Sequence, residues 1–201
     1  MSANATLGTV RLEAFSDGVI AILITIMVLE LKVPHGEDPW ILLSVWPVFA
    51  SYVISFLTIA VYWVNHHAML HQARRCTPAV LWANIFWLFC LSLIPFATGY
   101  VGENHVSRFG ATMYCGVLLL TGFGYLLLRM ALAQEHRGNA AYHEAYCSAS
   151  RKHYTAIAAY AVAMVVSWFL SPYVGFGISF LVVAAYFIPN EWLGEAATEK
   201  A

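Results

Sequence analysis

Charge is scarce in this chain. Only 10% of its 201 residues are Asp, Glu, Lys or Arg, whereas soluble domains are about 25% charged. Apolar residues make up 61% of the chain, and the mean hydropathy is +0.69. A soluble fold of this size leaves roughly a third of its unfolded-chain surface exposed, so it could not hide so much apolar area. The composition therefore predicts an integral membrane protein surrounded by a lipid bilayer.

Basic runs and metal-binding spacings are also missing. The net charge is −1, and no cluster of Lys and Arg suggests a nucleic-acid partner. The spacing of the four cysteines matches no metal site. His67 and His71 stand at i and i+4, which could place two ligands on one helix face, but no third ligand follows at a useful spacing. We therefore expect neither a metal nor a cofactor.

Enzyme signatures are absent as well. The sequence contains no GxSxG, HExxH or Walker motif, and no acid or base lies in the middle of an apolar stretch. This argues against an enzyme and against a proton relay through the bilayer. The Thr-Val-Gly-Tyr-Gly filter of ordinary potassium channels is missing too.

What the chain does have is six apolar stretches, each long enough for a membrane helix or nearly so. They predict an all-α integral membrane protein in which residues 1–201 form a single domain. Gln134 to Lys152 is the only long polar connection, and it could hold a short amphipathic helix. Pro172 is expected in the first turn of the last helix, after a tight hairpin. The stretches span about 14–33, 41–64, 79–101, 109–132, 154–171 and 174–191.

Basic residues set the expected orientation. Cytoplasmic segments carry an excess of Lys and Arg. If the N-terminus is inside, the outer segments hold only Lys32 and Arg108. The sequence thus predicts a multi-pass cell-membrane protein with both termini in the cytoplasm. The inner segments then hold eight basic residues: Arg11, Arg74, Arg75, Arg129, Arg137, Arg151, Lys152 and Lys200.

The first apolar stretch carries an unusual stripe. Ile22, Ile26 and Leu29 stand at i, i+4 and i+7 and so share one helix face, with Thr25 beside them. Copies of this helix around an axis would form rings of branched apolar side chains with a threonine ring between them. Such rings can close a pore by dewetting, and hydroxyls can replace part of an ion's water shell. The alternative is that the stripe packs against neighbouring helices.

Polar residues gather at the start of the same helix. In the expected topology, Arg11, Ser16 and Asp17 lie at the cytoplasmic level of His66, His67 and Asn84. An aspartate at a membrane boundary is costly to desolvate, so we expect these neighbours to hold it by hydrogen bonds and to lock the helix base. Ser16 could instead cap the start of the helix.

These residues resemble the transmembrane protein 175 family. The match lies in Arg11-x-x-x-Phe15-Ser16-Asp17, which begins an apolar helix containing Thr25. The stretches Trp63-Val-Asn65-His66-His67 and Asn84 to Pro95 also look like that family. The resemblance covers roughly residues 8–100.

The resemblance implies a homotetrameric channel whose six-helix subunits each contribute their first helix to a central pore. It implies passive conduction of monovalent cations, with potassium preferred. By distance from Asp17, the main constriction falls on Ile22, the hydroxyl layer on Thr25, and further apolar layers on Ile26 and Leu29. Phe15, Ser16 and Asp17 are expected to be tied to the second and third helices. An alternative function remains at this point: a small secondary transporter that uses Asp17 with His66 and His67 as a protonation switch.

Overall fold

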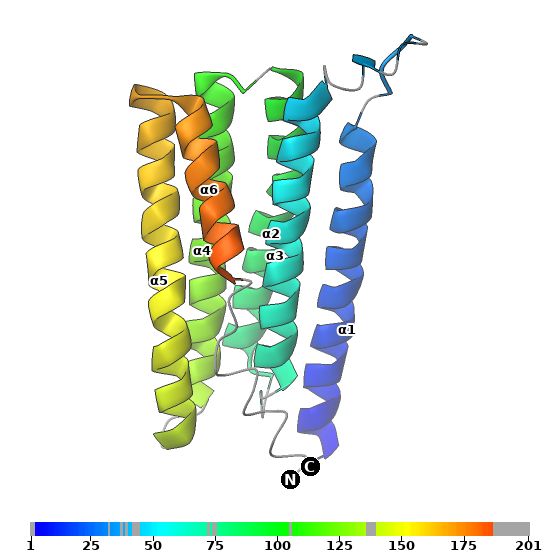
Figure 1. The fold of residues 1–201 in the computed structure, drawn as a ribbon. Coiled ribbons are helices and arrows are strands. Elements are labelled where there is room, and N and C mark those ends of the chain that lie inside the picture. Colours follow the sequence, from blue (N-terminus) through cyan, green and yellow to red (C-terminus); the bar gives the residue numbers. More distant parts are fainter. Residues whose placement is uncertain are drawn as a thin grey trace, which may run out of the picture.

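Six α-helices pack side by side in the computed structural model (Figure 1). The structure describes residues 3–31, 33–36, 38, 40–41, 45–71, 73, 76–104, 106–135 and 140–186. Within these ranges the regular structure is entirely helical. The elements are α1 (Ala3–Ile26), a 3-10 turn η1 (Met27–Glu30), α2 (Trp46–His71), α3 (Pro78–Glu103), α4 (Arg108–Glu135), α5 (Ala140–Phe169) and α6 (Pro172–Tyr186).

Among the described residues, four helical segments are long and apolar enough to cross a membrane. They are Gly8–Glu30, Trp46–His71, Pro78–Glu103 and Arg108–Gln134. The described part of α6 is also apolar but has only 15 residues. The all-helical membrane protein predicted from composition is therefore what the structure shows.

Helix limits differ from the predicted apolar stretches at several ends. α1 begins at Ala3 rather than at about residue 14, and α2 begins later and ends later than 41–64. α5 begins at Ala140, so much of the segment predicted as a polar connection is helical. Apolar runs mark the part of a helix that suits lipid, whereas Ala, Glu, Lys and Arg continue a helix into water without difficulty. The predicted end of the last stretch, at 191, lies outside the described residues.

Local sequence accounts for the sharp helix starts. The Thr77 side chain accepts a hydrogen bond from the Val80 backbone N–H at 3.4 Å, and Pro78 follows in the first turn of α3. α5 ends at Phe169 and α6 begins at Pro172, which confirms the predicted tight hairpin. These short connections keep consecutive helices adjacent.

Helix order positions the candidate site. α1 lies at one side of the bundle and packs against α2 and α3, while α5 lies at the other side and packs against α4 and α6 (Figure 1). Consecutive helices run in opposite directions. The first residues of α1, α3 and α5 therefore share one end of the bundle with the last residues of α2 and α4.

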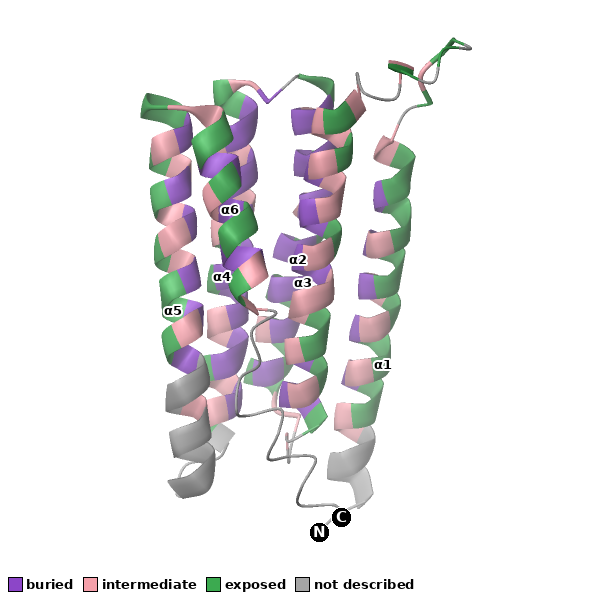
Figure 2. Ribbon diagram, in the orientation of Figure 1, coloured by how far each residue is buried: buried purple, intermediate pink, exposed green. Residues whose placement is uncertain are grey.

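The core combines aromatic rings with small residues and buried hydroxyls. Figure 2 shows buried residues on the facing sides of the helices. Small residues let helices approach closely: a Cβ added to Gly175 of α6 would lie 2.7 Å from the Ala163 carbonyl oxygen of α5. The buried Ser55 hydroxyl bonds Thr98 of α3 at 2.6 Å and Tyr114 of α4 at 2.8 Å. Helices α2, α3 and α4 are thus joined by polar contacts in the interior.

Candidate functional site

Helix α1 has a buried face that packs against α2 and α3. Its members recur every three or four residues, as one side of a helix does. In Figure 2 this inner side of α1 is coloured buried or intermediate, and the outer side exposed. The buried residues are Leu12, Ser16, Ile20 and Leu23, followed by Met27 of η1.

The opposite face of α1 is open. Ile22 is 60% exposed, Ile26 40% and Leu29 76%. The predicted stripe is therefore exposed in the single chain, where it does not pack against the other helices. We call Ile22, Thr25 and Ile26 of α1, together with Leu29 of η1, the open face of α1.

Thr25 is the polar member of the open face. Its hydroxyl lies 3.0 Å from the Ala21 carbonyl oxygen and 2.9 Å from that of Ile22, so it donates within its own helix. A threonine hydroxyl has one proton and two lone pairs. Donation to the backbone therefore leaves the oxygen able to accept, which is what a cation or its water requires.

Three helices meet at the base of α1 through a chain of hydrogen bonds. Asn84 of α3 donates from Nδ2 to Ser16 Oγ at 2.9 Å, and its Oδ1 lies 2.8 Å from His66 Nε2 of α2. Ser16 donates in turn to the Leu12 carbonyl oxygen at 2.8 Å. Ser16, His66 and Asn84 are all fully buried. Because an amide oxygen can only accept, this chain requires the proton of His66 on Nε2.

The His66 ring also stacks on a tryptophan. Its centroid lies 4.6 Å from that of Trp87, with an angle of 21° between the planes. His66 Nδ1 and Trp87 Nε1 have no hydrogen-bond partner among the described residues. The imidazole is therefore held by one hydrogen bond and one stacking contact, both to α3.

Asp17 has a different partner from those predicted. Its Oδ1 accepts a hydrogen bond from Trp63 Nε1 at 2.8 Å. We expected donors from His66, His67 and Asn84, but His66 and Asn84 bond each other and Ser16. The sequence pattern places these side chains at one level, but their pairing depends on how each helix is rotated.

A second missed contact lies next to the first. His67 Nδ1 lies 2.9 Å from Glu13 Oε1, and the His67 ring stacks on that of Trp63. Glu13 and Asp17 stand at i and i+4 on α1, as Trp63 and His67 do on α2. The matching i, i+4 spacings on the two helices were a signal in the sequence that could have identified both the Asp17–Trp63 and the Glu13–His67 contacts.

Two other predicted base residues stand apart from the hydrogen-bond chain. The Phe15 side chain is 56% exposed, and Arg11 is exposed with no polar contact to another described residue. Ser16 is not a helix cap, because α1 begins at Ala3 and Ser16 lies well inside it. We call Ser16, Asp17, Trp63, His66 and Asn84 the base network.

The side chains of this region are better suited to letting an ion pass than to catalysing a reaction. The open face offers branched apolar side chains and one hydroxyl oxygen, while the polar groups of the base network mostly satisfy one another. The bonds of Ser16 to Asn84 and of Asp17 to Trp63 join the base of α1 to α3 and α2. Rotating α1 about its own axis by one residue, about 100°, would turn the Ile22 side chain away from its present direction.

Comparisons with known proteins agree with this arrangement. The family described as "Endosomal/lysosomal potassium channel TMEM175" matches residues 11–95, which include the open face and the base network. A potassium channel of Chryseobacterium sp. strain P1-3 is 37% identical over 190 residues, covering 94% of this chain and 98% of the relative.

A solved structure and an animal relative extend the comparison. The crystal structure of a lysosomal potassium-selective channel TMEM175 homologue from Chamaesiphon minutus superposes with a TM-score of 0.77 at 30% identity, covering 90% of this chain and 96% of that one. The mouse endosomal/lysosomal proton channel TMEM175 is 31% identical over 106 residues, which cover 47% of this chain and 21% of the mouse protein.

Proposed function

The chain belongs to the TMEM175 family, and from this premise we propose that it is a potassium-preferring channel for monovalent cations. Four copies form a homotetramer, each subunit contributes six membrane helices, and four copies of α1 surround a central pore. Conduction is passive, so the protein is not an enzyme and needs no cofactor beyond the permeant potassium ions. The potassium-channel name of the bacterial relative and the potassium-selective title of the matching structure support this function.

The observation that carries the proposal is the open face of α1. Ile22 is 60% exposed and Leu29 76% exposed, so this apolar face is available to the α1 helices of other subunits. Around a fourfold axis, the Ile22 side chains form the tightest ring, and Ile26 and Leu29 form further apolar layers. Rings of this kind can gate by dewetting. Thr25 supplies hydroxyl oxygens between them and favours potassium by replacing part of its water shell.

The base network serves this pore by fixing α1. The bonds of Ser16 to Asn84 and of Asp17 to Trp63 tie α1 to α3 and α2. The exposed Arg11 and Phe15 take no part in these ties, whereas His67 adds one through Glu13 of α1. None of these residues lies on the ion path in this proposal, so their role is to hold the pore side chains in register.

The proposed location is the cell membrane, with both termini on the cytoplasmic side. The eight-to-two distribution of basic residues supports this orientation. Because consecutive helices alternate in direction, the described basic residues of the predicted inner segments lie at one end of the bundle. Lys32, Arg74, Arg75, Arg137 and Lys200 lie outside the described residues.

The transporter alternative has less support. A protonation switch of Asp17 with His66 would be served by direct contact, but in the described structure each bonds a different partner, Trp63 and Asn84. Coupled transport would show slow, saturable flux, whereas a channel shows unitary currents.

The test is reconstitution of the purified full chain in liposomes and planar bilayers. Flux is measured first under a potassium gradient and then under a sodium gradient, and single-channel currents are recorded. Unitary currents with faster potassium flux are expected. Saturable flux without unitary currents would overturn the channel in favour of the transporter, and a current carried only by protons would overturn the cation assignment.

Ile22→Ala tests the pore position directly. Widening the narrowest apolar ring should raise the unitary conductance. Val165→Ala is the matched control, because Val165 is also about half exposed but lies on α5, which packs mainly against α4 and α6. An equal response in the two variants would contradict a pore lined by α1.

A further inference from the structure

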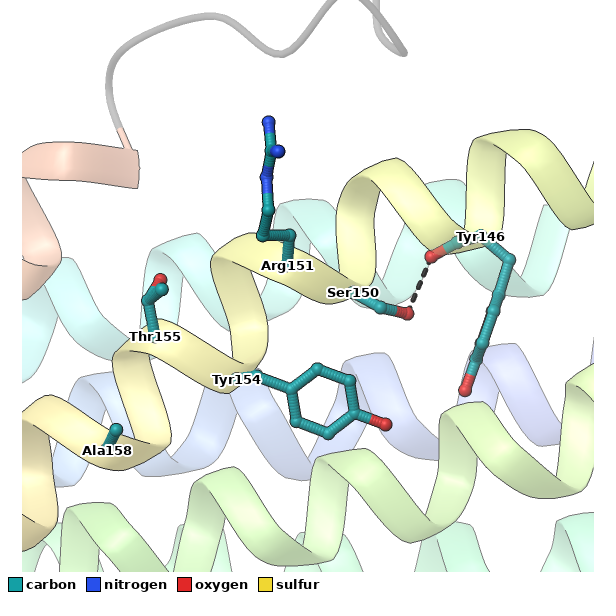
Figure 3. A pocket seen from close by; sticks show the side chains of 6 residues that line it. All are labelled: Tyr146, Ser150, Arg151, Tyr154, Thr155 and Ala158. Atoms are coloured by element: carbon teal, nitrogen blue, oxygen red, sulfur yellow. Dashed lines mark hydrogen bonds between the residues drawn. The ribbon is translucent and has the colours of Figure 1, made fainter.

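A hollow lies along the first half of α5, on the opposite side of the bundle from α1. Its volume is about 530 Å³. Figure 3 shows Arg151 and Thr155 projecting from one side of the helix and the Tyr154 ring from another. The lining residues are Tyr146, Ser150, Arg151, Tyr154, Thr155 and Ala158.

A second hollow, of about 290 Å³, lies between α5 and α6 and shares Thr155 with the first. Its lining includes Lys152, Thr155 and Tyr186, and small or aliphatic residues line the rest. The two hollows together run from hydroxyls and basic groups into an apolar groove. The apolar lining consists of Ala156 and Ala159 of α5 with Ile178, Leu181, Val182 and Ala185 of α6.

Positive charge is concentrated at the polar end. Arg151 is exposed and Lys152 is half-buried, and the described lining of both hollows contains no acid. Behind the wall, buried Arg129 of α4 donates to Ser150 Oγ at 2.9 Å, and its guanidinium carbon lies 4.9 Å from the centre of the Tyr146 ring. A ligand at this end would therefore meet basic groups on the surface and a further one beneath it.

The shape of the hollow matches a molecule with a charged head and an apolar tail. Arg151 projects from α5 at this end, and its guanidinium can donate to a phosphate. The alanines of α5 leave room for an acyl chain beside the branched side chains of α6. Basic pockets between membrane helices on the cytoplasmic side are suited to anionic lipid head groups.

We propose that this α5–α6 hollow binds one anionic glycerophospholipid of the cytoplasmic leaflet, with its phosphate on Arg151 and one acyl chain in the apolar groove. The leaflet assignment rests on the proposed topology, which places the start of α5 in the cytoplasm. In the proposed tetramer α1 lies at the axis, so α5 and α6 are at the perimeter, where lipid is the surrounding molecule.

Native mass spectrometry of the full-length protein in detergent tests this. Dioleoylphosphatidylglycerol and dioleoylphosphatidylcholine are titrated separately onto the wild type, Arg151→Gln and Arg108→Gln. Arg108 is an exposed arginine at the opposite end of the bundle and serves as the matched control. We expect the wild type to prefer the anionic lipid and Arg151→Gln to weaken its binding about fivefold, with no change in Arg108→Gln. Equal affinity for the two lipids, or an equal loss in both variants, would overturn the proposal.

A second arm tests the acyl groove and separates a lipid from a free phosphate. Ala159→Leu should fill the apolar part and weaken binding of phosphatidylglycerol, whereas Ala161→Leu, outside both hollows, should not. Inorganic phosphate should fail to displace the bound lipid; full displacement would mean that the hollow recognises phosphate alone. Because binding is measured without ion flux, a negative result here leaves the channel assignment standing, and a failed flux assay leaves the lipid site standing.

Discussion

Replacing Asn84 with leucine should loosen the base of α1. Asn84 is the only residue of the base network that bonds both other buried members, Ser16 at 2.9 Å and His66 at 2.8 Å. Leucine has the same branching and the same number of side-chain non-hydrogen atoms, so the substitution removes the polar contacts while keeping the shape of the side chain. Ser16 would keep its bond to the Leu12 carbonyl oxygen. His66 would lose its single hydrogen bond, because Nδ1 has no partner among the described residues.

The size of the effect follows from the two lost bonds. Interhelical hydrogen bonds in membrane proteins average about 0.6 kcal/mol and reach about 1.7 kcal/mol. Two of them give a range of about 1–3 kcal/mol. The stranded imidazole places Asn84→Leu toward the upper part of that range, since a buried polar group without a partner bears its full desolvation cost.

The assay is unfolding by a denaturing detergent in mixed micelles, with all variants at one protein concentration because assembly shifts apparent stability. Asn65→Leu is the matched control. Asn65 lies on α2 next to His66, but its amide donates only to the Val61 carbonyl oxygen of the same helix. We expect it to change the free energy of unfolding by less than about 0.5 kcal/mol.

A double-mutant cycle makes the test specific. If Asn84 acts through Ser16, then Asn84→Leu and Ser16→Ala should show a coupling energy of at least about 0.5 kcal/mol. Additive effects, or equal effects of Asn84→Leu and Asn65→Leu, would refute the role of the network in holding α1.

Three further substitutions test other contacts. Trp63→Phe keeps an aromatic ring but removes the donor to Asp17, so it should destabilise the protein by about 1–2 kcal/mol in the same assay. Adding Asp17→Ala to this variant should lower the stability little further. A second loss of the same size would show that Asp17 acts through another contact. Gly175→Ala should lower the free energy of unfolding by about 1–3 kcal/mol, because its Cβ meets the backbone of α5. Gly177→Ala, with open space around the added Cβ, should leave the stability unchanged or raise it slightly. Similar stability of the two variants would contradict close α5–α6 packing. Thr25→Ala should lower the potassium-to-sodium permeability ratio from bi-ionic reversal potentials, and an unchanged ratio would remove the hydroxyl from selectivity.

Features of a single helix were readable from the sequence. The stripe of Ile22, Ile26 and Leu29 follows from helical spacing alone, and the structure shows it as an exposed face. The membrane environment followed from composition, because too little polar surface was available for a soluble fold. The hairpin at Pro172 followed from the chemistry of proline at a helix start.

Contacts between helices were not readable in the same way. The sequence placed Ser16, Asp17, His66 and Asn84 at one end of the bundle, but it could not say that Asn84 bonds Ser16 while Trp63 bonds Asp17. Those choices depend on the rotation and height of α1, α2 and α3, which the packing of all three helices sets together. Spacing along one helix is fixed by backbone hydrogen bonds, whereas partners across helices exist only once tertiary packing has brought them within reach.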